Sequence, residues 1–116
     1  MRVLIVDDDA RFTAALGALL ETEGISVVGT ATNGAEGVAA AAKLRPDVVT
    51  MDLAMPVMDG LEATRRLAPL GIPVVVLTGS RSRGGDAVKA GAAAFVLKSD
   101  APVLLTRVLR TVVEAA

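Results

Sequence analysis

The sequence contains no cysteine, histidine, tryptophan or tyrosine, and Phe12 and Phe95 are its only aromatic residues. Without cysteine, disulfides and thiolate metal sites are excluded. Without histidine, the chain lacks the commonest general base and the usual zinc ligand. Any metal ion must therefore be bound through oxygen atoms, and the core must be almost entirely aliphatic.

The sequence also has no long apolar run and no large excess of charges of one sign. The longest apolar runs, such as Ile72–Leu77, are far too short to span a bilayer. The N-terminal apolar run reaches Asp7 too early for a secretory signal. The net charge of −1, from 12 basic and 13 acidic residues, argues against non-specific nucleic-acid binding. We therefore expect a cytoplasmic protein that contacts neither a membrane nor nucleic acid directly.

The chain has the length of one domain, 116 residues, of which 53% are hydrophobic and 22% charged. We expect a single domain over residues 1–116, without an output domain. Apolar, β-branched runs alternate five times with segments of helical spacing, as is typical of strands buried on both faces of a parallel sheet. Right-handed crossovers place helices on both faces, which favours a flavodoxin-like, doubly wound α/β fold with strand order 2-1-3-4-5. The runs are Val3–Val6, Ile25–Thr30, Val48–Met51, Val74–Leu77 and Ala94–Leu97.

Helix starts are marked by capping residues. The pairs Asn33–Glu36 and Asp59–Glu62 have the spacing of an N-cap whose acid reaches back to the cap amide. Asp9 and Asp100 are expected to cap the first and last helices, with Pro102 in the first turn of the last. Apolar stripes predict the buried faces of these two helices, at Phe12, Leu16, Leu19 and Leu20 and at Leu104, Val108, Leu109 and Val112.

The segment Ser80–Ala90 is the weakest of the expected helices. It contains the pair Gly84-Gly85, two serines and few strong apolar residues. Glycine disfavours the helix by about 1 kcal/mol relative to alanine. We therefore expect a short or frayed helix in this segment.

Polar residues follow four of the five strands at their carboxyl ends, where open parallel sheets bind ligands. Taken singly, each has an ordinary explanation as a cap, a turn residue or a solvated strand end, and Asp9 is assigned as a cap. Taken together, they bring carboxylates, a hydroxyl and an ammonium to one edge of the sheet. The residues are Asp7, Asp8 and Asp9 after the first strand, Asp52 after the third, Thr78 after the fourth and Lys98 after the fifth.

This set of groups suits a phosphoryl group on Asp52. Neighbouring carboxylates repel one another unless a cation compensates, and Mg²⁺ is the natural cation for such ligands. A carboxylate can act as a nucleophile and form an aspartyl phosphate. Mg²⁺, Lys98 and Thr78 would then each neutralise one equatorial phosphoryl oxygen.

The same residues carry a family resemblance. Met51–Gly60 resembles the segment around the phosphorylated aspartate of response regulator receiver domains. Val6–Asp8 resembles the acidic pair of that family, and Leu77–Gly79 and Phe95–Lys98 resemble its two remaining motifs. The resemblance covers the whole chain in the right order. It implies a signalling domain, not an enzyme acting on other substrates, that takes a phosphoryl group from a sensor histidine kinase or phosphotransfer protein and later dephosphorylates itself.

The resemblance also implies Mg²⁺ dependence, with the backbone carbonyl of Ala54 completing a metal site formed by Asp7, Asp8 and Asp52. Thr78 would move inward on phosphorylation and Phe95 would follow it. The surface of the fourth helix, fifth strand and fifth helix would thereby change towards an output domain, an effector protein or a second copy of the chain.

Two positions and one segment depart from the family pattern. Ser99 stands where a proline in a cis peptide often follows the lysine. The segment between Thr78 and Gly91 is a residue or two shorter than usual. The switch position is Phe95 instead of a tyrosine, so it has no phenolic hydroxyl.

Other functions are known on the same architecture. A pseudo-receiver would keep the fold and act as an interaction module without phosphorylation, which only the atypical segment before Gly91 favours. A haloacid-dehalogenase-type phosphatase usually needs a second acid two positions after the nucleophile, where Ala54 stands. A flavin carrier would need a Ser/Thr/Gly-rich loop after the first strand, where three aspartates would repel the phosphate.

Overall fold

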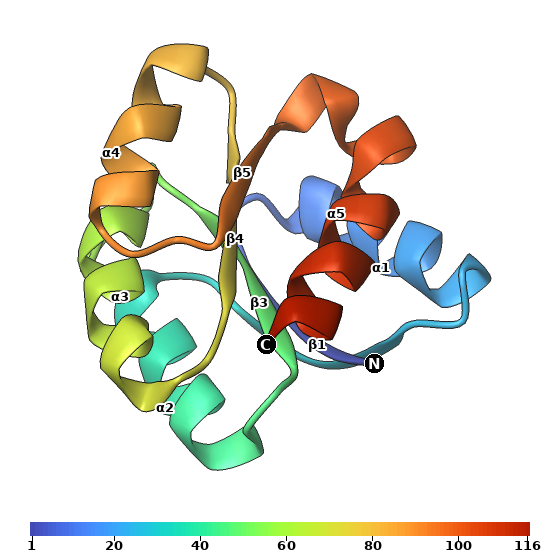
Figure 1. The fold of residues 1–116 in the computed structure, drawn as a ribbon, viewed down its shortest axis with the longest axis horizontal. Helices are drawn as coiled ribbons and strands as arrows, with labels where there is room; N and C mark the ends of the chain where they lie inside the picture. Colours follow the sequence, from blue (N-terminus) through green and yellow to red (C-terminus); the bar gives the residue numbers. More distant parts are fainter.

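The computed structural model describes residues 1–116 and contains one five-stranded parallel sheet with helices on both faces (Figure 1). The strand order β2-β1-β3-β4-β5 confirms the predicted topology. Three short 3-10 helices, Ala68–Leu70, Arg81–Arg83 and Lys98–Asp100, complete the connections. The main elements are β1 Arg2–Val6, α1 Ala10–Thr22, β2 Ser26–Ala31, α2 Gly34–Leu44, β3 Val48–Asp52, α3 Gly60–Leu67, β4 Val74–Thr78, α4 Gly84–Lys89, β5 Ala94–Leu97 and α5 Ala101–Ala115.

The sheet separates two aliphatic cores. Successive side chains of a strand point to opposite faces, so Val3 and Ile5 of β1 pack with the helices α1 and α5, and Leu4 and Val6 pack on the other side with α2 and α3. Figure 1 shows α1 and α5 together on one face and α2, α3 and α4 on the other. Full burial of such a side chain contributes about 2 kcal/mol. Both faces therefore hold the sheet, and with it the strand ends, in place.

The predicted caps of the first three helices are confirmed. The Asp9 side chain accepts hydrogen bonds from the backbone N–H groups of Arg11 and Phe12, at 3.0 and 3.2 Å. Asn33 and Asp59 each accept the N–H of the residue three positions on, at 2.9 Å. Three helix starts thus follow directly from local side-chain chemistry.

Some details of the capping prediction are wrong. The Glu36 carboxylate accepts hydrogen bonds from the N–H and hydroxyl of Thr32, and these bonds lower the pKa of Glu36. Asp100 does not cap α5 with its side chain, because its backbone is already helical within the 3-10 turn Lys98–Asp100. That turn occupies the place of the family's proline, and all peptide bonds are trans.

The predicted stripe on α5 is right only in part. Leu109 is buried, whereas Leu104 is 38% exposed. The buried row begins at Ala101, the first residue of the helix, and continues through Leu105 to Leu109. Ala101, Leu105 and Leu109 pack in the same core as the strand residues, so this row of the helix faces the sheet. On α1 the prediction holds, with Leu16 and Leu20 buried.

The helix between β4 and β5 is short, as expected. Arg81–Arg83 forms a single 3-10 turn, and α4 has only six residues, Gly84–Lys89. No side chain caps its start. None of the helices combines the length and hydropathy that a membrane-spanning segment requires.

Candidate functional site

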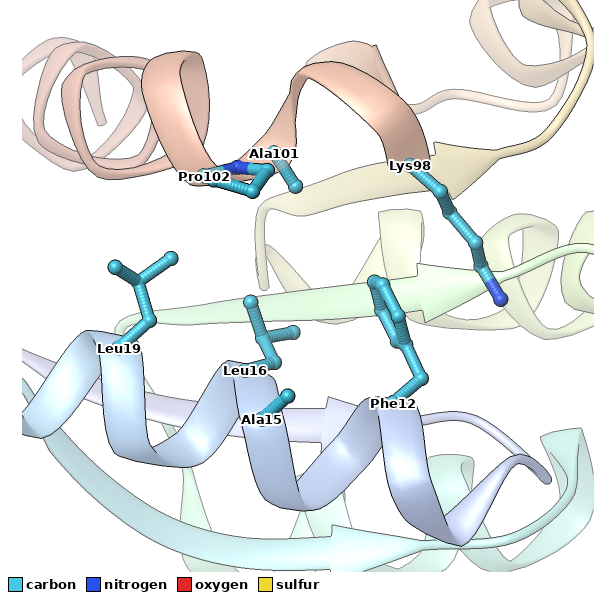
Figure 2. A pocket seen from close by; sticks show the side chains of 7 residues that line it. All are labelled: Phe12, Ala15, Leu16, Leu19, Lys98, Ala101 and Pro102. Carbon is cyan, nitrogen blue, oxygen red and sulfur yellow. The ribbon is translucent and has the colours of Figure 1, made fainter.

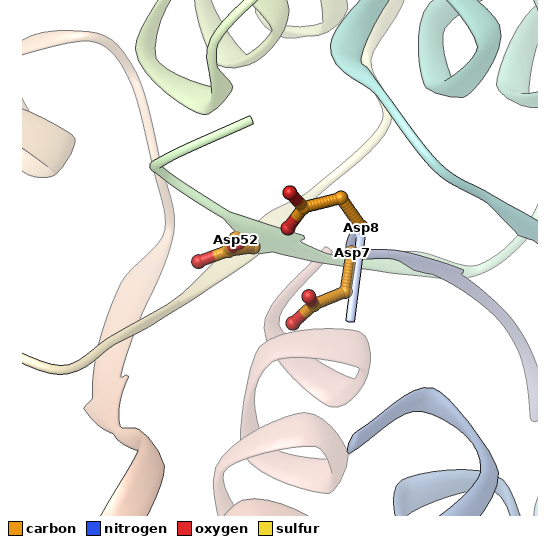
Figure 3. Close-up of side chains that lie close together, drawn as sticks. All are labelled: Asp7, Asp8 and Asp52. Atoms are coloured by element: carbon orange, nitrogen blue, oxygen red, sulfur yellow. The ribbon is translucent and has the colours of Figure 1, made fainter. Parts of the chain in front are cut away.

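Three carboxylates meet at the carboxyl edge of the sheet (Figure 3). Asp7 and Asp8 follow β1, and Asp52 is the last residue of β3. Because β1 and β3 are hydrogen-bonded neighbours, with Val6 opposite Met51, their ends lie side by side. Oxygen atoms of the three carboxylates lie within 4.8 Å of one another, with Asp7 and Asp52 buried and Asp8 exposed.

Asp7 is held in a fixed orientation. One carboxylate oxygen, Oδ1, accepts the backbone N–H of Asp9 at 2.8 Å, and the other, Oδ2, accepts a hydrogen bond from Lys98 Nζ at 2.9 Å. Its own N–H donates to the carbonyl of Ala31 on the neighbouring strand. Each carboxylate oxygen retains a further lone pair for another ligand. The bend after β1 thus orients this acid before any ligand binds.

Lys98 is the ammonium partner of the carboxylates. It follows β5, and its Nζ lies 2.9 Å from Asp7 Oδ2 and 3.4 Å from Asp52 Oδ1. Burial lowers the pKa of Lys98, but the hydrogen bond to Asp7 and the negative charges of Asp52 and Asp7 outweigh that effect and raise it overall. The ammonium therefore keeps its charge at neutral pH.

The surroundings of Asp52 disfavour the charged form of its carboxyl group. Its burial is the largest cause that raises the pKa of its carboxyl group, and the nearby charge of Asp7 raises it further, whereas Lys98 opposes both. The three carboxylates and one ammonium leave a formal charge of −2 in the cluster. A small divalent cation with oxygen ligands would neutralise that charge, so the donor set fits Mg²⁺.

Thr78 and Phe95 lie where the sequence placed them, and the structure adds their contacts. Thr78 is buried at the end of β4, and its hydroxyl exchanges hydrogen bonds with the backbone of Ser80, at 3.2 and 3.3 Å. Its hydroxyl is thus engaged locally and not with Asp52. Phe95 is 38% exposed, and its ring lies against Gly84 of α4.

The loop after β3 contains Ala54, which is exposed. Two backbone hydrogen bonds of 2.9 Å anchor this loop, from Gly60 to Leu53 and from Gly34 to Met58. A β-carbon on Gly60 would collide with the carbonyl of Asp52, and one on Gly34 would collide with that of Met58. The sequence signal for these close approaches is that Gly34 and Gly60 directly follow the caps Asn33 and Asp59, but the close approaches themselves were not predicted.

The structure also brings Phe12 and Lys98 together, a contact that the sequence does not predict. A pocket of about 170 Å³ between α1 and α5 borders the site at Lys98 (Figure 2). Phe12 lines it, and the Phe12 ring centroid lies 4.5 Å from Lys98 Nζ. The sequence indicated Phe12 only as part of an apolar stripe. Nothing in its spacing relates it to residue 98.

Known proteins resemble this chain in sequence over most of its length. The family model described as "Response regulator receiver domain" matches residues 3–110. Protein-glutamate methylesterase/protein-glutamine glutaminase 3 of Hahella chejuensis is 50% identical over 91 residues, which are 78% of this chain and 26% of that protein. Protein-glutamate methylesterase/protein-glutamine glutaminase of Archaeoglobus fulgidus is 46% identical over 105 residues, covering 86% of this chain and 30% of that protein. The chain thus spans less than a third of these relatives.

Solved structures show the same fold. The response regulator domain of Thermotoga maritima CheB matches with a TM-score of 0.91 and 27% identity, over 98% of this chain and 96% of that one. A two-component response regulator of the LuxR family from Aurantimonas matches with a TM-score of 0.92 and 28% identity, over 98% and 85%. With the family model covering almost the whole sheet and the site, the chain belongs to the response regulator receiver domain family.

Proposed function

We propose that the protein is a phosphoacceptor switch of a two-component system, in which Asp52 accepts a phosphoryl group from a sensor histidine kinase or phosphotransfer protein. The observation that carries the proposal is the meeting of Asp52 with Asp7, Asp8 and Lys98 at one strand edge. A buried carboxylate beside two further acids and one ammonium has no evident structural purpose, because the repulsion raises the cost of folding.

The transfer can be written from the contacts. Lys98 approaches Oδ1 of Asp52, which leaves Oδ2 to attack phosphorus. As the new O–P bond forms, the P–N bond of the donor's phosphohistidine breaks, and its electron pair stays on the imidazole nitrogen. The ammonium of Lys98 then lies beside the phosphoryl oxygens and offsets their negative charge.

The metal site would be formed by Asp7, Asp8 and Asp52, with the carbonyl of Ala54 as a further ligand. These are hard oxygen donors, and two of the carboxylates are buried. Bound Mg²⁺ would supply positive charge to the phosphoryl oxygens. The fixed orientation of Asp7 would lower the entropic cost of assembling this site.

The response would pass from Thr78 to Phe95. To donate to a phosphoryl oxygen, the Thr78 hydroxyl must give up the hydrogen bond that it donates to the backbone carbonyl of Ser80. Phe95 would then turn inward from Gly84 and change the surface of α4, β5 and α5.

That surface exposes Val88, Phe95 and Leu104. We propose it as the contact for an effector or an output domain, and the methylesterase relatives make an effector of that class the first to test.

A pseudo-receiver remains the second candidate, because α4 has only six residues and no side-chain cap. Incubation with acetyl phosphate and Mg²⁺, followed by intact-mass spectrometry, separates the two. Wild type should gain the mass of one phosphoryl group, and Asp52→Asn should gain none. Glu21→Gln, an exposed acid far from the site, serves as the control and should behave as wild type. No added mass on wild type, or equal mass on Asp52→Asn, would overturn the proposal.

A further inference from the structure

We propose that Phe12 is a positioning residue of the phosphoryl site, and that its ring holds the ammonium of Lys98 where it can serve Asp52. The inference rests on the proposed function. The two residues are far apart in the chain, yet Lys98 Nζ lies 4.5 Å from the centroid of the ring. Figure 2 shows the ring projecting from α1 towards the end of the Lys98 side chain, which enters from the opposite side of the pocket.

Phe12 is itself tied to the acidic cluster. Its N–H donates to Oδ1 of Asp9 at 3.2 Å, and the N–H of Asp9 donates to Asp7 at 2.8 Å. The carboxylate of Asp7 in turn binds Lys98. Phe12 also packs against the core between the sheet, α1 and α5. The backbone and the ring are therefore both fixed relative to the carboxylate that Lys98 contacts.

Lys98 needs such support. Its side chain is a flexible four-carbon stem that loses much rotamer freedom when ordered, and it is 26% exposed. Asp7 alone would draw the ammonium away from Asp52, since the Lys98–Asp7 contact is already the shorter of the two. The ring attracts the cation through the negative face of its π system. Unlike a further carboxylate, the ring cannot accept a proton from the Lys98 ammonium, and it adds no negative charge to the site.

If Phe12 had a purely structural role, its substitution would affect the stability of the fold but not phosphorylation. The far end of the same pocket is lined by Leu19, which also packs against the core and does not approach Lys98 (Figure 2). If Phe12 only fills space, Phe12→Leu and Leu19→Ala should both act on stability alone. If Phe12 positions Lys98, only its own substitution should change phosphorylation.

The test measures the initial rate of phosphorylation by acetyl phosphate at saturating Mg²⁺. Phe12→Leu should lower kcat/KM threefold to tenfold, as expected for one cation–π contact. Phe12→Tyr, which restores an aromatic ring, should stay within twofold of wild type, and so should Leu19→Ala. Phe12→Met is a second variant without a ring, in case Phe12→Leu does not fold. In a Lys98→Met background, Phe12→Leu should have no further effect.

An NMR measurement tests the contact between Phe12 and Lys98 without relying on phosphorylation. The ring current of Phe12 should shift the Lys98 Hε protons upfield in the NMR spectra of wild type and Phe12→Tyr, and this shift should vanish in Phe12→Leu. Equal rates for wild type and Phe12→Leu would overturn the proposal, as would an undiminished effect of Phe12→Leu in the Lys98→Met background. A wild type that takes no phosphoryl group would instead overturn the proposed function, and the NMR shift would still decide whether the ring holds Lys98.

Discussion

The ring of Phe95 lies against the α-carbon of Gly84, in the space that a β-carbon at position 84 would occupy. The contact joins β5 to the first residue of α4. It gives Gly84, which weakens the helix, a physical role. Only a residue without a side chain lets the ring rest in this place.

Replacing Gly84 by alanine should therefore destabilise the fold, although alanine is the better helix former. We expect a loss of about 1–3 kcal/mol, typical of an overpacked contact. Gly85→Ala is the matched control, because no atom lies near its missing β-carbon, and it should gain about 0.5–1 kcal/mol. Urea unfolding measures both values. A stabilised Gly84→Ala would show that Phe95 leaves its place at little cost.

Asp52 should make stability depend on pH in a specific direction. Burial, and then the charge of Asp7, raises the pKa of Asp52 above the ordinary value of 3.8. For an acid whose pKa is higher in the folded state, the stabilising contribution is full below the unfolded pKa and is lost as the pH rises through the folded pKa.

Asp52→Asn, measured without Mg²⁺, should therefore be more stable than wild type at pH 7. The difference should shrink as the pH is lowered through the folded pKa of Asp52 towards 3.8. Urea unfolding midpoints over a pH series test this dependence. A less stable Asn variant at pH 7 would mean that the Lys98 contact outweighs the cost of burial.

Val57 adopts a left-handed backbone conformation, with φ of 68°, in the loop that follows β3. This conformation is strained for a β-branched residue and costs about 1–2 kcal/mol, whereas asparagine tolerates it. Val57 is 85% exposed, so no packing is lost on substitution. Val57→Asn should raise the unfolding free energy by about 1 kcal/mol. The same substitution at the equally exposed helical Val103 should change it by less than about 0.5 kcal/mol.

Mg²⁺ should raise the melting temperature of the wild type. A ligand at about 100 times its Kd stabilises the folded state by about 2.7 kcal/mol. Asp8→Asn should remove most of this Mg²⁺-dependent shift while leaving the melting temperature in EDTA within a few degrees, because Asp8 is exposed. Glu21→Gln should keep the full shift. An Asp8→Asn protein with the full shift would exclude Asp8 as a ligand.

Much of the fold could be predicted because the deciding interactions are local. Asn33 and Asp59 mark helix starts through contacts only three residues long. Apolar strand runs follow from burial on both faces, and the handedness of crossovers then restricts the strand order. The prediction was wrong where distant contacts decide. Asp100 lies in a 3-10 turn, and Leu104 is turned outward because the row Ala101, Leu105 and Leu109 is the one buried against the sheet.

Which groups stand at the carboxyl edge of the sheet follows from the order of residues along the chain, since strand direction and order assign each strand end to that edge. The order of residues could not determine which atoms meet there. Three contacts depend on side-chain rotamers and helix rotation. Lys98 lies closer to Asp7 than to Asp52, the Thr78 hydroxyl hydrogen-bonds to the backbone of Ser80, and the Phe12 ring lies 4.5 Å from the Lys98 ammonium. The rotamers and the helix rotation are decided by the packing of segments that are far apart in the chain, and only the tertiary structure contains that information.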